Sequence, residues 1–367
     1  MRTLVVSDLH FGTHAGTDVL RDRRRRAPLL AALAGCDRLV LLGDVLELRH
    51  GPLHAALAAA REPLAELGAA LGPDGEVILL AGNHDHYLVH AWSQRRAAAG
   101  PPPPLGLESA VDWTPAESLD ALAGVLAPAR VRCAYPGVWL RPDVWATHGH
   151  YLDVHMTVPS IERLGAGVMR RIVAVGRNET RPPLGAEDYE AILTPIYAWL
   201  HAVAQGAMPG RGSDLQGGSV RGWRALTGPR GRRGLRGRAL AAGWPVLIAA
   251  LNRAGLGPLR AEVSGPALRR SGLRGMDEVC ARLGVSPGYV IFGHTHRAGP
   301  LPDDDPTEWT TRSGARLINS GCWVHEPAFM GADASQSPYR TGFCVVVDDD
   351  GPPRLLNLSD PGPPDLG

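Results

Sequence analysis

Five short segments of the sequence combine glycine with side chains that can bind metal ions. In chain order they are Asp8-Leu9-His10, Gly43-Asp44, Gly82-Asn83-His84-Asp85, His148-Gly149-His150 and Gly293-His294-Thr295-His296. Carboxylate, imidazole and amide oxygen groups are all ligands for divalent cations. No packing requirement explains five such segments in one chain, so the pattern predicts a two-metal hydrolase.

The elements expected around these segments would bring them together. Short apolar or β-branched runs, bounded by Gly, Pro or polar residues, predict buried strands at Arg2–Ser7, Arg38–Leu42, Val77–Ala81, Val138–Thr147 and Tyr289–Phe292. Each metal-binding segment begins where such a run stops. In layered α/β folds the loops beyond the carboxyl ends of the strands converge on one edge. We therefore expect the five segments to surround one point.

The residue types also indicate which metals would bind and what they would do. Asp44 offers two carboxylate oxygens, which suit a bridge between two cations, and the other candidate ligands are Asp8, His10, Asn83, His148, His294 and His296. A mixed nitrogen and oxygen shell suits Mn²⁺, Fe or Zn²⁺ better than Mg²⁺ or Ca²⁺. Two cations about 3.5–4 Å apart can hold a hydroxide between them and clamp the oxygens of a phosphoryl displacement.

The segments SDLH, GDVLE, GNHD, THGH and GHTH occur in the order found in the calcineurin-like metallophosphoesterase superfamily, which this chain resembles. The resemblance covers residues 1–150 and 286–347. It implies an α/β fold of two facing β-sheets flanked by helices. It also implies two divalent metal ions, for which we expect Mn²⁺, with Fe or Zn²⁺ as alternatives.

Carried over by position, the resemblance gives each candidate ligand a role. One metal would be held by Asp8, His10, Asp44 and His296, and the other by Asp44, Asn83, His148 and His294, with Asp44 as the bridge. Either His148 or His150 could reach the second metal. We favour His148 because it is closer to the end of the predicted strand, which leaves His150 behind it and as a candidate for substrate binding.

His84 and Asp85 are the predicted catalytic residues. The resemblance implies that His84 faces the substrate and stabilises or protonates the leaving oxygen, which requires an imidazole able to reach its cationic form. Asp85 would orient His84. A chain that binds metal without turnover is the alternative, and the intact ligand set together with His84 argues against it.

The predicted domains differ in character. Residues 1–150 and 286–359 would form the phosphoesterase core, 151–285 an arginine-rich helical cap insertion, and 360–367 a disordered tail. Apolar spacing predicts helices at Pro159–Val175, Gly185–Gly206, Arg238–Ala254 and Met276–Leu283, with a loop at Met208–Gly237. Residues 151–297 carry 20 Arg against 10 Asp and Glu, a net charge of +10, and the rest carries 18 against 27, a net charge of −9.

This charge division predicts an anionic, phosphate-containing substrate, with Arg221 and Arg224 as candidate contacts in the insertion. The apolar stretch Leu240–Leu251 is either buried against protein or in contact with an anionic membrane. An arginine-rich insertion beside SDLHFG and GDVLE is similar to the UDP-diacylglucosamine pyrophosphatases. His84 and His150 depart from that subgroup, which commonly has Arg and Asp there. We expect no nucleic-acid partner, and the sequence does not predict an oligomeric state.

The predicted function is a dinuclear metal-dependent phosphoesterase, in which a bridging hydroxide attacks a phosphodiester or pyrophosphate of a nucleotide-like or lipid-linked substrate. The alternatives are a phosphomonoesterase acting on nucleotides or sugar phosphates, and a metal-binding scaffold without catalysis. The sequence shows neither a secretory leader nor a run of about 18 apolar residues. We therefore expect residence in the cytoplasm, with peripheral placement at the inner membrane face if the insertion binds lipid.

Overall fold

The computed structural model describes residues 1–14, 16–100, 103–177, 185–206, 235–327, 329–330 and 333–360. The chain divides into two compact units. The first comprises Met1–His150, Leu200–Gly212 and Val285–Gly367, and the second comprises Tyr151–Trp199 and Ser213–Gly284. Arg221, Arg224, most of the predicted loop at 208–237 and the predicted tail from 361 onward lie outside the described residues.

The first unit contains a ten-stranded sheet in the order β10-β9-β1-β2-β3-β5-β6-β7-β8, with β4 paired to β5 beside this path. The strands are β1 Thr3–Val6, β2 Arg38–Leu42, β3 Glu76–Leu80, β4 Glu108–Val111, β5 Arg130–Arg141, β6 Val144–Thr147, β7 Tyr289–Phe292, β8 Arg316–Asn319, β9 Phe343–Val347 and β10 Arg354–Asn357. Every predicted strand is present, although the predicted run at Val138–Thr147 is divided between β5 and β6.

The long strand β5 connects two parts of this sheet. Its first residues pair in parallel with β3, and its later residues, from Gly137, pair antiparallel with β6. Fully buried side chains from both parts meet in one apolar layer, which contains Val5, Val40 and Ile78 from one part and Ala146 and Ile291 from the other. The prediction of two facing β-sheets is confirmed, with the addition that β5 belongs to both.

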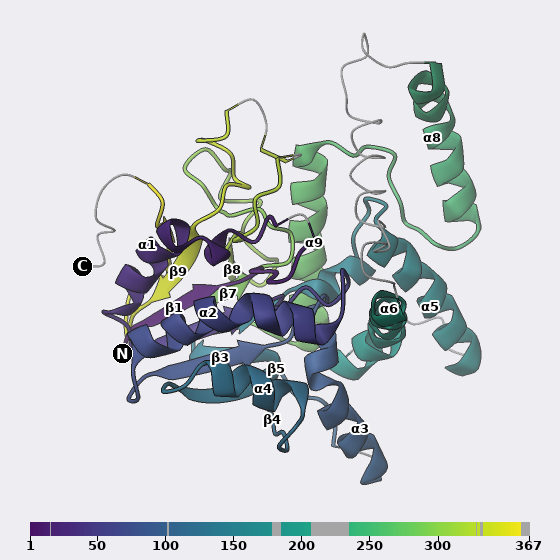
Figure 1. Ribbon diagram of the computed structural model, residues 1–367. Coiled ribbons are helices and arrows are strands. Elements are labelled where there is room, and N and C mark those ends of the chain that lie inside the picture. The colour runs from purple at the N-terminus through teal and green to yellow at the C-terminus, as the bar shows by residue number, and fades with distance from the viewer. Residues whose placement is uncertain are drawn as a thin grey trace. The chain divides into compact units, whose positions relative to one another are not determined.

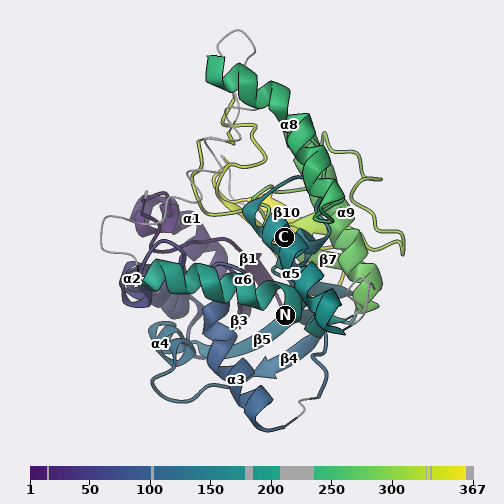
Figure 2. The same ribbon diagram turned by 90° about the vertical axis from the view of Figure 1, so that its right-hand side faces the viewer.

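Helices cover the opposite face of the part that contains β1, β2 and β3. Figures 1 and 2 show α1 (Arg23–Leu33), α2 (Leu53–Leu71) and α4 (Ser118–Val125) along the same flank of these strands. In α2 the buried residues Ala56, Ala60, Leu64 and Leu67 recur at helical spacing, so they form one apolar face. Burying a leucine side chain such as Leu64 contributes roughly 1.5–3 kcal/mol to stability.

Strand direction decides where the metal-binding segments lie. The strands β1, β2 and β3 run parallel to one another, and so do β6, β7 and β8. The carboxyl ends within each group therefore share an edge, and each predicted metal-binding segment follows one of these ends.

The second unit is mainly helical. It contains α5 (Ile161–Arg177), most of α6 (Ala186–Gly206), α8 (Leu235–Arg253) and α9 (Gly265–Leu283). Helix α9 begins well before the predicted start at Met276, because Ser264 caps it by accepting a hydrogen bond from the Ala267 amide. None of the helices among the described residues combines the length and the apolar character that a membrane crossing requires.

The apolar layer between the two parts of the sheet can be tested at Ile78, which is fully buried. We expect Ile78→Ala to lower the free energy of unfolding by about 2–5 kcal/mol, since it removes packing atoms and leaves a cavity, and Ile78→Val by about 0.5–1.5 kcal/mol. Urea denaturation followed by circular dichroism measures both. Equal, small losses in the two variants would contradict the facing arrangement.

Candidate metal centre

The loops at the carboxyl ends of the strands bring all the predicted ligands into two neighbouring clusters. Groups whose ligand atoms lie within 4.8 Å of one another are Asp8, His10 and His296; Asp44, His148 and His294; and His10, Asp44 and His84. Asp44 and His10 each belong to two of these groups. The groups are therefore parts of one extended centre.

The first cluster is built around Asp8. His296 Nε2 lies 3.2 Å from Asp8 Oδ1 and 3.2 Å from His10 Nε2. Asp8 Oδ2 accepts hydrogen bonds from Ser7 Oγ at 2.6 Å and from the His294 amide at 3.0 Å. Asp8 Oδ1 is buried and accepts no hydrogen bond from the described residues. An oxygen left in this state beside two imidazoles has the environment of a metal ligand.

The second cluster is built around His148. Its Nδ1 donates to the carbonyl oxygen of Leu42 at 2.9 Å, which fixes the tautomer and directs Nε2 toward Asp44 Oδ2, 3.3 Å away. Asn83 Oδ1 lies 3.1 Å from His148 Nε2 and 2.9 Å from His294 Nδ1. The opposite amide orientation would direct the nitrogen of Asn83 at these atoms and its oxygen at Arg49. Metal ligation requires the first orientation.

Asp44 joins the two clusters. Its Oδ2 lies 3.6 Å from His10 Nε2 as well as 3.3 Å from His148 Nε2, and its Oδ1 accepts a hydrogen bond from the His84 amide at 2.8 Å. The carboxylate is therefore within reach of both positions at which a cation could sit. The donor set fits the two-metal arrangement that the sequence predicts, with Asp44 between the metals.

The electrostatics of the centre favour added positive charge. Burial alone would raise the pKa of Asp44, but His148 and His84 hold it well below its usual range. Burial alone would lower the pKa of His148, but Asp44 raises it to about 9. In the absence of another cation the His148 imidazole therefore carries a proton at pH 7. A metal ion bound here would take the place of that proton.

The backbone of the ligand loops adopts an unfavourable conformation. Of the six non-glycine residues with positive φ among the described residues, five are predicted ligands: Asp8, His10, Asp44, His294 and His296. Such a conformation costs about 1–3 kcal/mol at each residue and persists only where the surroundings impose it. Here the His10 amide donates to the carbonyl oxygen of Asp44 at 2.9 Å. Gly82 is also constrained, because a Cβ there would lie 2.2 Å from Asp44 Oδ1.

Comparison with known proteins agrees with this geometry. Residues 1–176 match the model of the calcineurin-like phosphoesterase family. This match and the Asp and His clusters support a hydrolase that acts on phosphoester bonds, and the clusters fit the divalent metals that the matched family binds.

One similar solved structure is a dimetal phosphatase from Danio rerio. It is 14% identical, the match covers 98% of this chain and 99% of that chain, and the TM-score is 0.38. No curated protein matches the chain.

His84, the predicted catalytic histidine, is held by a residue that the sequence did not single out. Glu47 Oε2 accepts from His84 Nδ1 at 2.8 Å and from His10 Nδ1 at 3.0 Å. Asp85, predicted to orient His84, instead accepts hydrogen bonds from the Gly82 and Val45 amides, each at 2.7 Å. The role predicted for Asp85 is therefore wrong, because its short side chain holds together the backbone of the two ligand loops. Glu47 is the last residue of the GDVLE segment, so this motif was the feature of the sequence by which Glu47 could have been found.

Arg49 is a second residue that the sequence analysis missed. Its side chain is buried, with Nη2 donating to the carbonyl oxygen of Asn83 at 3.0 Å and Nη1 lying 3.3 Å from His84 Nε2. Burial, and next the positive charge of Arg49, lower the pKa of His84 to about 4. His84 is therefore neutral at pH 7, and its surroundings disfavour the cationic form that the predicted role requires. The fixed positive charge at this position belongs to Arg49.

His150 lies behind the centre. It is 1% exposed, and its Nε2 lies 3.2 Å from the hydroxyl oxygen of Tyr135. Its ring packs beside the ring of His148, with centroids 5.6 Å apart. These contacts give no support to a role in substrate binding, and of the two histidines only His148 belongs to a ligand cluster. Arg221 and Arg224, the other predicted substrate contacts, lie outside the described residues.

Metal binding can be tested by replacing Asp44. We expect the chelated protein to take up two divalent cations per chain in calorimetric titration, and to gain about 2.7 kcal/mol of stability per bound cation at a free metal concentration 100 times the dissociation constant. Asp44→Asn removes the shared carboxylate and should lose at least one cation. Asp303→Asn, at an exposed aspartate outside the centre, should bind as the wild type does. Unchanged stoichiometry in Asp44→Asn would remove Asp44 from the centre.

Proposed function

We propose that the protein is a dinuclear metal-dependent phosphoesterase that cleaves a phosphodiester or pyrophosphate bond in a nucleotide-like or lipid-linked substrate. The observation that carries this proposal is the position of Asp44, whose Oδ2 lies 3.6 Å from His10 and 3.3 Å from His148, one member of each cluster. A shared carboxylate between two sets of imidazoles suits two cations at short separation. That separation is the one used in phosphoryl transfer by two-metal enzymes.

The chain's own residues would position the reacting groups. When bound, the cations supply Lewis-acid activation of water and of the phosphoryl oxygens. Glu47 fixes the rings of His10 and His84 from behind through their Nδ1 atoms. Arg49 holds a cationic guanidinium next to His84 Nε2, where it would stabilise negative charge that develops on the phosphoryl group. Neutral His84 would contribute by hydrogen bonding and not as an imidazolium acid.

We propose Mn²⁺ as the resident metal. The four imidazoles and the carboxylates of the clusters form a mixed nitrogen and oxygen shell. Such a shell suits Mn²⁺, with Fe and Zn²⁺ as the alternatives. Reconstitution of the chelated protein with each of the three metals in turn would rank them by turnover.

Substrate class can be tested with two synthetic esters. Chelated protein reconstituted with Mn²⁺ should hydrolyse bis-p-nitrophenyl phosphate faster than p-nitrophenyl phosphate, since we propose a diester or pyrophosphate substrate. Asp44→Asn is the control for adventitious hydrolysis. Preference for the monoester would instead favour a phosphomonoesterase that acts on nucleotides or sugar phosphates. Metal uptake without turnover of either ester would favour a non-catalytic scaffold.

The roles of Arg49 and His84 can be separated by substitution. Loss of one well-placed charge-stabilising group typically lowers kcat by about 10²–10³. We expect a loss of this size in Arg49→Gln and in His84→Ala, with partial activity in Arg49→Lys because the positive charge is kept. Metal stoichiometry should stay at the wild-type value in all three variants. Wild-type kcat in Arg49→Gln would show that Arg49 only supports the fold.

We also propose that the second unit contacts an anionic membrane, so that the protein works in the cytoplasm at the inner membrane face. Five of the seven exposed large apolar side chains among the described residues belong to this unit: Val168, Ile172, Trp199, Val246 and Leu247. Val246 is 71% exposed on α8, whose sequence also contains arginines. An exposed apolar surface beside basic residues suits an anionic bilayer.

Vesicle co-sedimentation tests this contact. Wild-type protein should sediment with phosphatidylglycerol vesicles at low salt and remain in solution with phosphatidylcholine vesicles, because the attraction is partly electrostatic. The double variant Val246→Asp and Leu247→Asp should sediment less. Absence of wild-type protein from the phosphatidylglycerol pellet would eliminate the membrane contact.

A further inference from the structure

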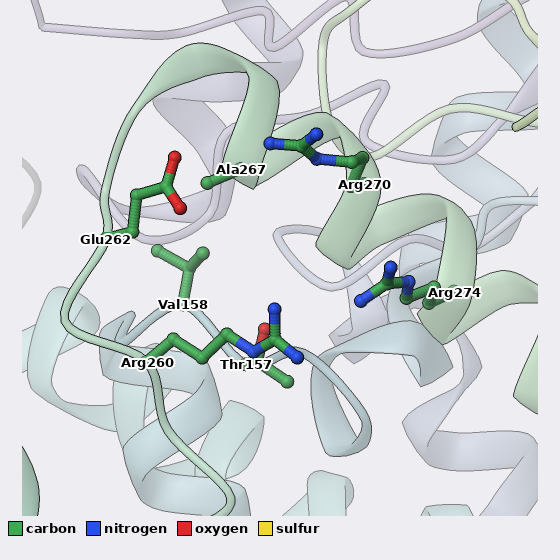
Figure 3. A pocket seen from close by; sticks show the side chains of 7 residues that line it. All are labelled: Thr157, Val158, Arg260, Glu262, Ala267, Arg270 and Arg274. Carbon is green, nitrogen blue, oxygen red and sulfur yellow. The ribbon is translucent and has the colours of Figure 1, made fainter.

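The second unit has a pocket of its own, formed by residues that the metal centre does not use. It has a volume of about 260 Å³. The lining residues are Thr157, Val158, Arg260, Glu262, Ala267, Arg270 and Arg274 (Figure 3). All seven belong to the second unit. Three of the seven are arginines, so the pocket is strongly basic.

The three arginines come from two different segments and share one space. Arg260 lies in the loop that precedes α9, whereas Arg270 and Arg274 lie four residues apart on α9 and therefore on the same face of that helix. Figure 3 shows the side chains of all three directed into the space between that loop and α9. The side chain of Glu262 lies across this space from Arg274.

The guanidinium groups of Arg260, Arg270 and Arg274 take part in no hydrogen bond or ion pair with the residues that the structure describes. Other arginines of the chain are paired, as Arg141 is with Asp143 at 2.9 Å and Arg297 with Asp304 at 2.6 Å. Three cations around one pocket repel one another unless an anion lies between them. Glu262 offsets only one of the three positive charges and makes no ion pair with the arginines, while its Oε1 accepts a hydrogen bond from Ser264 Oγ at 2.6 Å.

The walls of the pocket are fixed by hydrogen bonds that do not involve the arginine side chains. The Arg260 amide donates to the carbonyl oxygen of Thr157 at 2.7 Å, and the Thr157 amide donates to Ser271 Oγ, also at 2.7 Å. The Ala267 amide donates to Ser264 Oγ at 3.3 Å, which caps α9 beside the pocket. The backbone that carries the arginines is thus held in place before any ligand binds, which lowers the entropic cost of binding.

We propose that this pocket binds the phosphate group of a small organic phosphate, separately from the metal centre. Guanidinium groups donate paired hydrogen bonds that match phosphate oxygens, and several of them suit a dianion. The N-terminal turn of α9, which contains Ala267, adds favourable interaction with negative charge. The volume of about 260 Å³ is at the lower limit of small-molecule sites, so the ligand carries only a short substituent on its phosphate.

Calorimetric titration of the full-length protein with inorganic phosphate at low salt tests the proposal. We expect binding that is the same in chelated and in Mn²⁺-loaded protein, apart from any additional phosphate bound at the metals. The double variant Arg270→Gln and Arg274→Gln should bind at least about tenfold more weakly, since two charge-assisted donors are lost. Arg260→Gln, from the other wall, should also weaken binding. Arg253→Gln, at an exposed arginine outside the pocket, should bind as the wild type does.

A second experiment distinguishes whether the bound phosphate belongs to a soluble molecule or to a lipid head group. Wild-type protein and the double variant are mixed with vesicles that contain phosphatidic acid, whose head group is a phosphate monoester. Binding to inorganic phosphate that the double variant loses supports a soluble ligand. Vesicle binding alone, lost in the double variant but not in Arg253→Gln, supports the same chemistry on a lipid.

The proposal is overturned if chelated wild-type protein binds neither probe, or if the double variant binds both as the wild type does. Thermal melting of each variant verifies that it is folded, and the substituted side chains are exposed. Because the titration is performed on chelated protein, its outcome does not depend on the phosphoesterase activity. Failure of this site and failure of the proposed function are therefore separate results.

Discussion

The structure of the first unit depends on the burial of Asp44. A charged carboxylate removed from water is unfavourable unless partners surround it. Asp44 is 1% exposed, and its partners are the His84 amide and the imidazoles of His10 and His148, which come from different loops. Those loops adopt positive φ at Asp8, His10, Asp44, His294 and His296. Because the parallel strands end at one edge of the sheet, they hold these strained loops close enough together to supply the polar partners of the Asp44 carboxylate.

Charge alternates outward from this carboxylate. Imidazoles surround Asp44, and Glu47 accepts hydrogen bonds from two of them, His10 and His84. Arg49 lies on the other side of His84. The neighbouring histidines hold the pKa of Glu47 well below its usual range although burial alone would raise it, whereas Arg49 disfavours the cationic form of His84. Replacement of any one member therefore changes the charge state of its neighbours as well as its own contact.

The two candidate sites differ in charge. The first unit gathers carboxylates and imidazoles, whereas the pocket of the second unit is lined by three arginines. This division agrees with the net charges of −9 and +10 on the two parts of the sequence, which cancel in the whole chain. The net charge of +1 for the whole chain therefore conceals two oppositely charged parts.

The sequence by itself determined the strands and the ligand set. Apolar runs that end in glycine and a polar ligand are local patterns, so they predicted β2 and β7 to the residue and placed His148 and His294 at strand ends.

Tertiary structure decided the remaining features, because they depend on which side chains meet across the fold. Glu47 and not Asp85 holds His84, burial and then Arg49 lower the pKa of that histidine, and β5 joins both parts of the sheet. Likewise Arg260, Arg270 and Arg274 are ordinary surface arginines in sequence. They form a pocket only because the loop before α9 folds back against the helix, and side-chain proximity of this kind is not encoded in spacing.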